Sequence, residues 1–294
     1  MMQLIQKVIK EELKVSPGDL PLAFLKYSTA SSGKNLKDKV IFFVFKPKEK
    51  TPFLCVKTVR SHTSGEVVRQ NFHNLKKLNE LTAGSSYQDF FAKAIHLYDD
   101  GENIFSLESV CPGKRVRLDE RLLGAVVSRY TGFQEHISKR SNQSVSDLQG
   151  FKASLVNNSS LSEADQAEIL LFTNSLTLPK TLPKLIQHGD LTEDNMLFEA
   201  GKFSVVDCDY LGVMDLPGFD LFSLFRRYSL KDAKKLCEQY LAEYFKRIGA
   251  SVKKEDYLGL MFLYYFMEKT LRKPGLLRGV PGKKVIAEFT ADFF

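Results

Sequence analysis

Polar side chains that could bind a metal ion or move a proton are concentrated in residues 187–209 (QHGDLTEDNMLFEAGKFSVVDCD). Asp190 follows a short apolar run, Asn195 comes directly before Met-Leu-Phe, and Asp207 follows Phe-Ser-Val-Val. Oxygen ligands at the ends of short strands can converge on one hard cation, and Mg²⁺ favours carboxylates together with phosphate oxygens and water. Asn195 and Asp207 are therefore predicted as magnesium ligands. Asp190 is then available to face a substrate hydroxyl group.

A lysine is predicted to leave a β-sheet from an apolar face. Residues 40–45 (VIFFVF) and 53–59 (FLCVKTV) flank a polar turn that contains two prolines, a pattern typical of a hairpin. Alternation of side chains places Lys57 on the same face as Cys55 and Val59. An ammonium group in such a place is costly unless it meets an anion. A phosphate-binding lysine is therefore favoured over a surface lysine on an edge strand.

The segment around Asp190 resembles the catalytic core of the kinase-like phosphotransferases, in particular the aminoglycoside phosphotransferase and choline kinase group. The catalytic loop of that family reads H-G-D-x-x-x-x-N, and a hydrophobic strand that ends in Asp follows it. His188, Gly189, Asp190 and Asn195 match the loop, and Asp207 matches the metal-binding Asp. The resemblance implies that Asp190 is the catalytic base, or orients the acceptor hydroxyl, while Asn195 and Asp207 hold Mg²⁺ on the nucleotide phosphates.

The same resemblance assigns the nucleotide-binding residues. Lys57 would contact the phosphates of ATP or GTP. Residues 105–113 (FSLESVCPG), with Glu108 and Val110, are similar to the hinge that binds adenine. Ser32 and Gly33 belong to residues 28–39, which would cover the nucleotide, although this stretch lacks the three glycines of the protein-kinase loop.

The usual acidic partner of the strand lysine is missing from its expected place in the sequence. Alignment of the helix at residues 66–81 with the family places Asn71 where a Glu normally pairs with the lysine. Glu66 lies near the start of that helix and is an alternative partner. An amide orients an ammonium group without neutralising it, so Asn71 indicates weaker nucleotide binding or a differently placed lysine.

Three further residues extend the predicted site. His188 is expected to brace the catalytic loop by hydrogen bonding, and Asp220 resembles the buried aspartate that ties down loop amides in the family. Asp209 is either a second metal ligand or a solvated turn residue. Only about a dozen residues separate Asp207 from Asp220, too few for the activation loop and A-P-E element of a protein kinase. A peptide substrate is therefore disfavoured.

The elements that must position these residues change in character along the chain. Apolar spacing predicts a helix over residues 66–81, and a second hairpin is predicted from residues 94–98 and 104–108. Beyond the break at residues 111–113 helices dominate, with a mobile loop expected over residues 141–162 and a helix capped by Ser162. The expected class is α+β, a two-lobed protein-kinase-like fold. A small antiparallel-sheet lobe with one main helix (1–110) precedes a larger, mostly helical lobe (111–294).

Composition excludes several other classes. The 294 residues are 44% hydrophobic and 26% charged, which is typical of a core-forming domain and excludes a disordered chain. The formal charge of +7 is mild, and its basic residues are scattered, so neither nucleic acid nor a membrane is expected as a partner. The four cysteines form no CxxC pair, which favours a reducing compartment, and a cytoplasmic location is expected.

The predicted function is transfer of the γ-phosphoryl group of ATP or GTP to a hydroxyl group of a small metabolite. An aminoglycoside, an amino-sugar or sugar, and a choline-like alcohol remain open as acceptors. Aromatic residues of the C-terminal half (Tyr257, Tyr264, Tyr265 and Phe266) would either line an acceptor pocket or pack a helix core. A catalytically weak, pseudokinase-like nucleotide-binding module is the alternative, and nucleic-acid binding is the least favoured.

Overall fold

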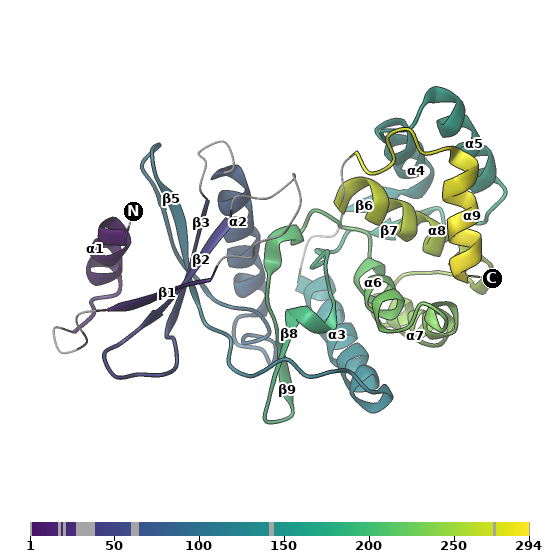
Figure 1. The fold of residues 1–294 in the computed structure, drawn as a ribbon. Helices are drawn as coiled ribbons and strands as arrows, with labels where there is room; N and C mark the ends of the chain where they lie inside the picture. Colours follow the sequence, from purple (N-terminus) through teal and green to yellow (C-terminus); the bar gives the residue numbers. More distant parts are fainter. Residues whose placement is uncertain are drawn as a thin grey trace. The chain divides into compact units, whose positions relative to one another are not determined.

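The computed structural model describes residues 2–16, 19, 22–27, 39–59, 65–140, 144–272 and 275–293. The chain divides into two compact units (Figure 1). Unit 1 contains Met1–Lys114 and Leu197–Asp209, and unit 2 contains Arg115–Met196 and Tyr210–Phe294. The division into lobes at residue 110 stays a prediction about domains. A later segment, Leu197–Asp209, joins the N-terminal residues in unit 1.

Unit 1 is built on a five-stranded antiparallel sheet with the order β1-β2-β3-β5-β4. Both predicted hairpins are confirmed, since β2 pairs with β3 and β4 pairs with β5. The strand β3, which carries Lys57, is the central strand, so the alternative of a lysine on an edge strand is wrong. The strands are β1 (Ala23–Tyr27), β2 (Lys39–Phe45), β3 (Leu54–Val59), β4 (Ala94–Asp99) and β5 (Ile104–Ser109).

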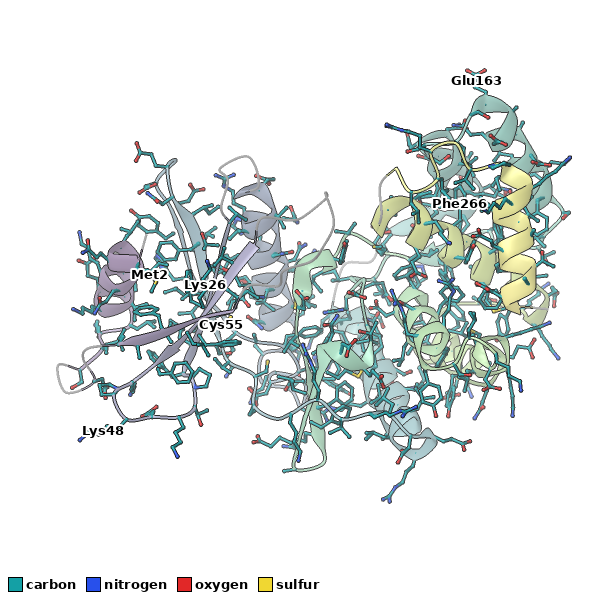
Figure 2. All side chains as sticks on the ribbon, in the orientation of Figure 1. Met2, Lys26, Lys48, Cys55, Glu163 and Phe266 are labelled. Carbon is teal, nitrogen blue, oxygen red and sulfur yellow. The ribbon has the colours of Figure 1, made fainter. Side chains whose placement is uncertain are left out.

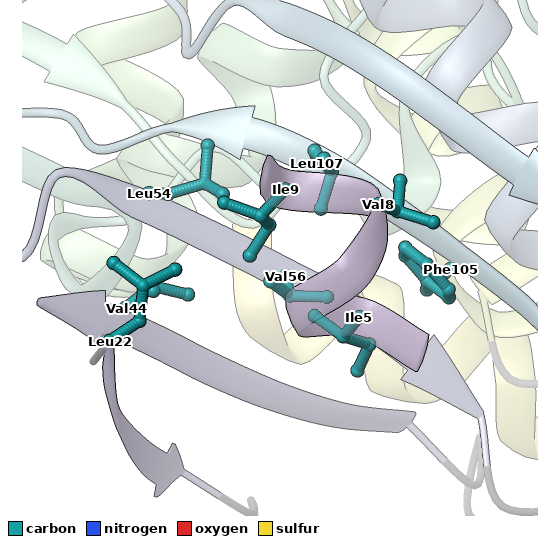
Figure 3. Packing of buried hydrophobic residues seen from close by; sticks show 9 residues of the cluster. All are labelled: Ile5, Val8, Ile9, Leu22, Val44, Leu54, Val56, Phe105 and Leu107. Atoms are coloured by element: carbon teal, nitrogen blue, oxygen red, sulfur yellow. The ribbon is translucent and has the colours of Figure 1, made fainter. Parts of the chain in front are cut away.

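Helices cover both faces of this sheet. The helix α1 (Met2–Glu12) buries Ile5, Val8 and Ile9 against one face, where Val56 and Leu107 point toward it (Figure 3). The predicted helix over 66–81 is confirmed as α2 (Gly65–Thr82), which lies against β3, β4 and β5. Gly65 of α2 approaches the side chain of Ile104. Because Ile104 alternates with the residues that face α1, α2 covers the opposite face, the face of Lys57.

Unit 2 is mostly helical, as the sequence predicts for the C-terminal part. Its helix α8 is apolar on all sides and is therefore buried. Tyr257, Tyr264, Tyr265 and Phe266 are all buried, which confirms that these aromatic residues pack the core, and Phe266 lies among the helices in Figure 2. The helices are α3 (Glu120–Arg140), α4 (Leu148–Asn157), α5 (Glu163–Asn174), α6 (Phe219–Tyr228), α7 (Ala233–Arg247), α8 (Tyr257–Met267) and α9 (Gly282–Phe293).

Two small sheets and several short helical turns complete the fold. The strands β6 (Val145–Asp147) and β7 (Thr181–Pro183) pair in unit 2, and β8 (Met196–Glu199) pairs with β9 (Lys202–Val205). The short turns are η3 (Glu193–Asn195), η4 (Cys208–Tyr210), η5 (Lys254–Asp256) and η6 (Glu268–Arg272). Within the described ranges, every helix is too short or too polar to cross a membrane.

The prediction of a mobile loop over residues 141–162 is wrong for the described residues 144–162. Residues 145–147 form β6, and α4 follows directly. Asp147 caps α4, because its carboxylate accepts hydrogen bonds from the backbone N–H groups of Gln149 and Gly150. One face of α4 is buried and carries Leu148, Leu155 and Val156. The abundance of Ser and Asn in this segment concealed a short amphipathic helix. The predicted cap at Ser162 is confirmed at the start of α5.

Candidate functional site

A buried carboxylate holds the loop that contains Asp190. Asp220 stands in the first turn of α6 and is fully buried. Its two oxygens accept the backbone N–H groups of His188 at 2.6 Å and Gly189 at 2.8 Å. The hydroxyl group of Tyr130 on α3 donates a third hydrogen bond. Burial raises the pKa of Asp220 above its ordinary value. These donors favour the charged form and offset part of that rise. The loop backbone is therefore fixed against α6.

Within unit 2, a network of amide side chains extends from Asp220. Gln187 donates to Gln134 at 2.8 Å, and its own amide oxygen accepts the backbone N–H of Asp220 at 3.4 Å. Gln134 in turn donates to the Tyr130 hydroxyl at 3.2 Å. Because Gln134 and Gln187 are fully buried, each polar atom needs such a partner. Tyr130 and Gln134 lie on α3, far from the loop in sequence, and no local pattern identified them.

The loop requires glycine at position 189. Gly189 has a φ of +81°, a conformation that favours glycine. A Cβ atom there would lie 2.6 Å from Cβ of Tyr210 and 2.7 Å from its carbonyl oxygen. The backbone at Gly189 therefore lies closer to Tyr210 than any residue with a side chain would allow. This approach fixes the position of the neighbouring Asp190.

The other predicted loop residues are joined by hydrogen bonds in unit 2. The backbone N–H of Asp190 donates to Nδ1 of His188 at 3.3 Å, and the Asn195 amide donates to the carbonyl oxygen of Asp190 at 2.9 Å. Asn195 is buried and Asp190 is half-buried. The amide nitrogen of Asn195 makes this bond, and its oxygen, the atom that Mg²⁺ would bind, is on the other branch of the group.

Asp207 lies in unit 1, after β9. That strand is anchored to unit 1 by two hydrogen bonds. The N–H of Val205 donates to the carbonyl oxygen of Phe90 at 2.8 Å, and the Ser204 hydroxyl donates to the backbone carbonyl oxygen of Asp89 at 3.1 Å. Asp207 is exposed and has a φ of +60°. Asp tolerates this left-handed conformation better than most residues, but it is uncommon outside glycine. A strained, exposed carboxylate on an anchored strand is a candidate functional group.

The two residues predicted as metal ligands, Asp207 and Asn195, carry oxygen donors only. In the described part of the chain, no group of three or more His, Cys, Asp or Glu side chains is placed to hold a metal ion. A closed structural site of the zinc type is thus not formed by these residues. A magnesium site needs only one or two protein oxygens, since phosphate and water supply the rest. The Asp207 carboxylate of unit 1 and the Asn195 amide oxygen of unit 2 are each an oxygen donor of the kind that Mg²⁺ prefers.

Lys57 is paired with an acid that the sequence did not indicate. Its Nζ lies 2.7 Å from Oε2 of Glu108, and the side chains are only 12% and 3% exposed. Burial alone would lower the pKa of Lys57, but the Glu108 carboxylate outweighs it and holds the pKa well above the ordinary value. Lys57 is therefore a group inside unit 1 whose charged form is favoured by its partner. The alternative that Glu66 is its partner is wrong, because Glu66 pairs with Arg69 instead.

The remaining predicted residues stand as follows. Ser32 and Gly33 lie outside the described residues, as does the side chain of Asp209. Val110 directly follows β5 and is half-buried. The predicted residues fall into two groups: Lys57, Glu108, Val110 and Asp207 belong to unit 1, and His188, Asp190, Asn195 and Asp220 belong to unit 2.

The helical unit matches a known family. Residues 121–259 match the model of the phosphotransferase enzyme family (APH). This region is just under half of the chain. It contains the His188–Asp190 loop, Asn195 and Asp220, so the family match and the braced loop coincide. The chain is accordingly a kinase-like phosphotransferase that acts on small molecules. No curated protein sequence matches it.

Solved structures with the same fold are distant in sequence. A thermostable mutant of aminoglycoside phosphotransferase APH(4)-Ia, in a ternary complex with ADP and hygromycin B, is 10% identical with a TM-score of 0.61 and 98% coverage of both chains. Wild-type aminoglycoside 2'-phosphotransferase-IIIa with GDP is 10% identical, with a TM-score of 0.56 and coverage of 100% and 99%. An amicoumacin kinase with AMP-PNP and Ca²⁺ is 13% identical, with a TM-score of 0.53 and coverage of 99% and 92%. These likenesses confirm the predicted protein-kinase-like α+β fold.

Proposed function

We propose that this chain transfers the γ-phosphoryl group of ATP or GTP to a hydroxyl group of a small metabolite. The observation that carries the proposal is the H-G-D loop, which Asp220 holds by two backbone hydrogen bonds within the family-matched region. A fixed carboxylate next to a fixed backbone is what positioning catalysis requires. The charged Lys57 in unit 1 supports the same activity from the nucleotide side.

Asp190 acts on the acceptor in this proposal. Its carboxylate orients the acceptor hydroxyl and takes its proton as the oxygen bonds to the γ-phosphorus. The bond between that phosphorus and the β,γ-bridging oxygen breaks, and the nucleoside diphosphate leaves with the bonding electrons. Asp190 is half-buried, so its carboxylate can meet a substrate from solvent. His188 and Asp220 act only through the backbone of the loop.

Lys57, Asn195 and Asp207 act on the nucleotide. Lys57 binds the phosphates and neutralises charge on them. Asn195 and Asp207 would hold Mg²⁺, which when bound offsets the charge that develops on the transferring phosphoryl group. Asp209 is proposed as an additional metal ligand. These roles need only oxygen donors and one ammonium group, the set that the described residues supply.

The purine is proposed to bind the hinge at the end of β5, at the backbone of Glu108 and Val110. Val110 follows the last hydrogen-bonded residue of the strand, so its backbone is outside the sheet ladder. The residues proposed to cover the phosphates are Ser32 and Gly33. Structures of similar fold hold ADP, AMP-PNP or GDP, which supports both ATP and GTP as donors to test.

The acceptor is proposed to be an aminoglycoside, an amino-sugar or sugar, or a choline-like alcohol. Hygromycin B and amicoumacin in structures of similar fold support an antibiotic or amino-sugar acceptor. The aromatic residues of α8 are buried in the core, so they do not support an aromatic cage for choline. A cytoplasmic location is proposed, because the four cysteines form no CxxC pair in the sequence.

The test is a panel of hydroxyl-bearing metabolites incubated with the protein, Mg²⁺ and γ-labelled ATP or GTP. We expect label on at least one acceptor with the wild type and none with Asp190→Asn. Asp194→Asn is the matched control, because Asp194 is an exposed acid of the same loop that matches no family position. Equal transfer by the wild type and Asp190→Asn would overturn the proposal.

The alternative, a weak pseudokinase-like module, rested on Asn71 and the glycine-poor loop. The Lys57–Glu108 pair weakens the first of these observations, since the lysine has an acidic partner after all. A pseudokinase would bind nucleotide and give no labelled acceptor in the same panel.

A further inference from the structure

Lys57 and Glu108 come from neighbouring strands of one sheet. In the antiparallel pairing of β3 with β5, Lys57 lies opposite Ser106 and Cys55 lies opposite Glu108. Lys57 and Glu108 are therefore diagonal neighbours on the same face, a separation that long side chains can bridge. Cys55 is labelled at this sheet in Figure 2. The ion pair is built into the register of the two central strands.

Glu108 is held from both sides of its carboxylate. Its Oε2 lies 2.7 Å from the lysine ammonium group, and its Oε1 accepts the Ser106 hydroxyl at 3.3 Å. The side chain is 3% exposed. A buried carboxylate with two such partners is expected to keep one position.

The helix α2 gives Lys57 no comparable partner among its acids. Its two acidic residues are Glu66 and Glu80. Glu66 lies in an ion pair with Arg69, and its side chain is 74% exposed, while Glu80 is exposed as well. Asn71 is buried in α2, but an amide does not neutralise an ammonium group.

We propose that Glu108, on strand β5, is the positioning residue that sets the place and charge of Lys57 for the phosphate donor. The proposal rests on the phosphotransferase function proposed above. The acid that pairs with the lysine comes from a neighbouring strand of the same sheet and not from a helix. A pair between hydrogen-bonded strands does not depend on where α2 lies. The lysine is thus held ready without a helix movement.

Glu108 is the charged group that acts most strongly on Lys57. The thiols of Cys55 on β3 and Cys208 in η4 also act on Lys57, Lys57 acts on Cys111 after β5, and the Asp207 carboxylate acts on Cys208. Burial raises the pKa of Cys111 to about 11, and that of Cys208 further. Removal of the Glu108 charge would leave the buried ammonium group without the carboxylate that lies 2.7 Å from it.

The test compares Glu108→Gln with Glu66→Gln, which removes the α2 acid nearest the usual position. We expect Glu108→Gln to lower kcat/KM for the nucleotide about ten- to hundredfold, the range for a lost hydrogen bond to a charged group. The KM for the acceptor should stay unchanged. Glu66→Gln should match the wild type. The pH profile should also change: Glu108→Gln should lose activity at a lower pH than the wild type, because desolvation then depresses the lysine pKa.

Two further variants make the result decisive. Glu108→Asp keeps the charge and should recover part of the loss. In a Lys57→Met background, Glu108→Gln should cause no additional loss, because Glu108 acts through Lys57. If thermal melting shows that Glu108→Gln is unfolded, the Asp variant against the wild type decides, and equal nucleotide kcat/KM overturns the proposal.

The two proposals fail in different ways. An inactive wild type would contradict the proposed function. An active wild type with unchanged Glu108→Gln kinetics, or an equal loss in Glu66→Gln, would contradict only the role of Glu108.

Discussion

Replacement of Gly189 by alanine tests how the catalytic loop is held. Gly249 is the matched control, since its φ of +75° is close to the +81° of Gly189 and it is exposed. An alanine at such a φ costs about 1–2 kcal/mol. At Gly249 a new Cβ has nothing within 4 Å, so that cost is the whole expected effect.

At Gly189 the new Cβ would lie 2.6 Å from Cβ of Tyr210, which forces the backbone to move. Overpacking of this kind adds about 1–3 kcal/mol, so Gly189→Ala should cost roughly 2–5 kcal/mol in total. Urea unfolding of both variants measures the difference. Because Asp190 is the next residue, phosphoryl transfer should also fall at least tenfold in Gly189→Ala and remain normal in Gly249→Ala. Equal stability of the variants, or full activity of Gly189→Ala, would refute the description of the loop.

Three further predictions concern other parts of the chain. Tyr264→Phe removes the donor to the Pro217 carbonyl at 2.5 Å and should lower the free energy of unfolding in urea by about 1–3 kcal/mol; no change would contradict this role. Hydrogen bonds to the Asp100 carboxylate, of which that from the Asn103 N–H has the largest effect, lower the pKa of Asp100 to about 2. The contribution of this carboxylate to the stability of the fold is therefore present above about pH 4 and lost as the pH falls toward 2. The melting temperatures of wild type and Asp100→Asn should thus converge over that range, and a constant gap would count against it. Asp207→Asn should raise the Mg²⁺ concentration for half-maximal activity at least tenfold without changing the melting temperature, because Asp207 is exposed; an unchanged Mg²⁺ requirement would argue against a metal ligand.

Much of the fold around the site follows from local sequence. Alternation in residues 53–59 predicts a strand with Lys57 on its inner face, and apolar spacing predicts the helix over 66–81. Both are confirmed, because each depends on a period that a few residues set. Ser162 marks the start of α5 for the same reason, since a cap involves only the next three residues.

The contacts that fix the site are long-range, and the sequence could not show them. Glu108 meets Lys57 only because β3 and β5 pair in one particular register, and no spacing between residues 57 and 108 encodes that register. Tyr130 on α3 contacts Asp220 on α6 across 90 residues of sequence, and Gln134 joins the network through its hydrogen bond to Tyr130. The α4 segment was missed for another reason: Ser and Asn are typical of loops, and its apolar face is only a few residues wide.

One measurement tests the central claim most directly: single-turnover transfer of labelled γ-phosphoryl from Mg²⁺-nucleotide to the acceptor identified in the panel, with Asp190→Asn and Asp194→Asn in parallel. A carboxylate at position 190 that takes the acceptor proton predicts a fall of about 10²- to 10⁴-fold for Asp190→Asn, with nucleotide affinity and the Asp194→Asn rate unchanged. An Asp190→Asn rate equal to that of the wild type would contradict the account.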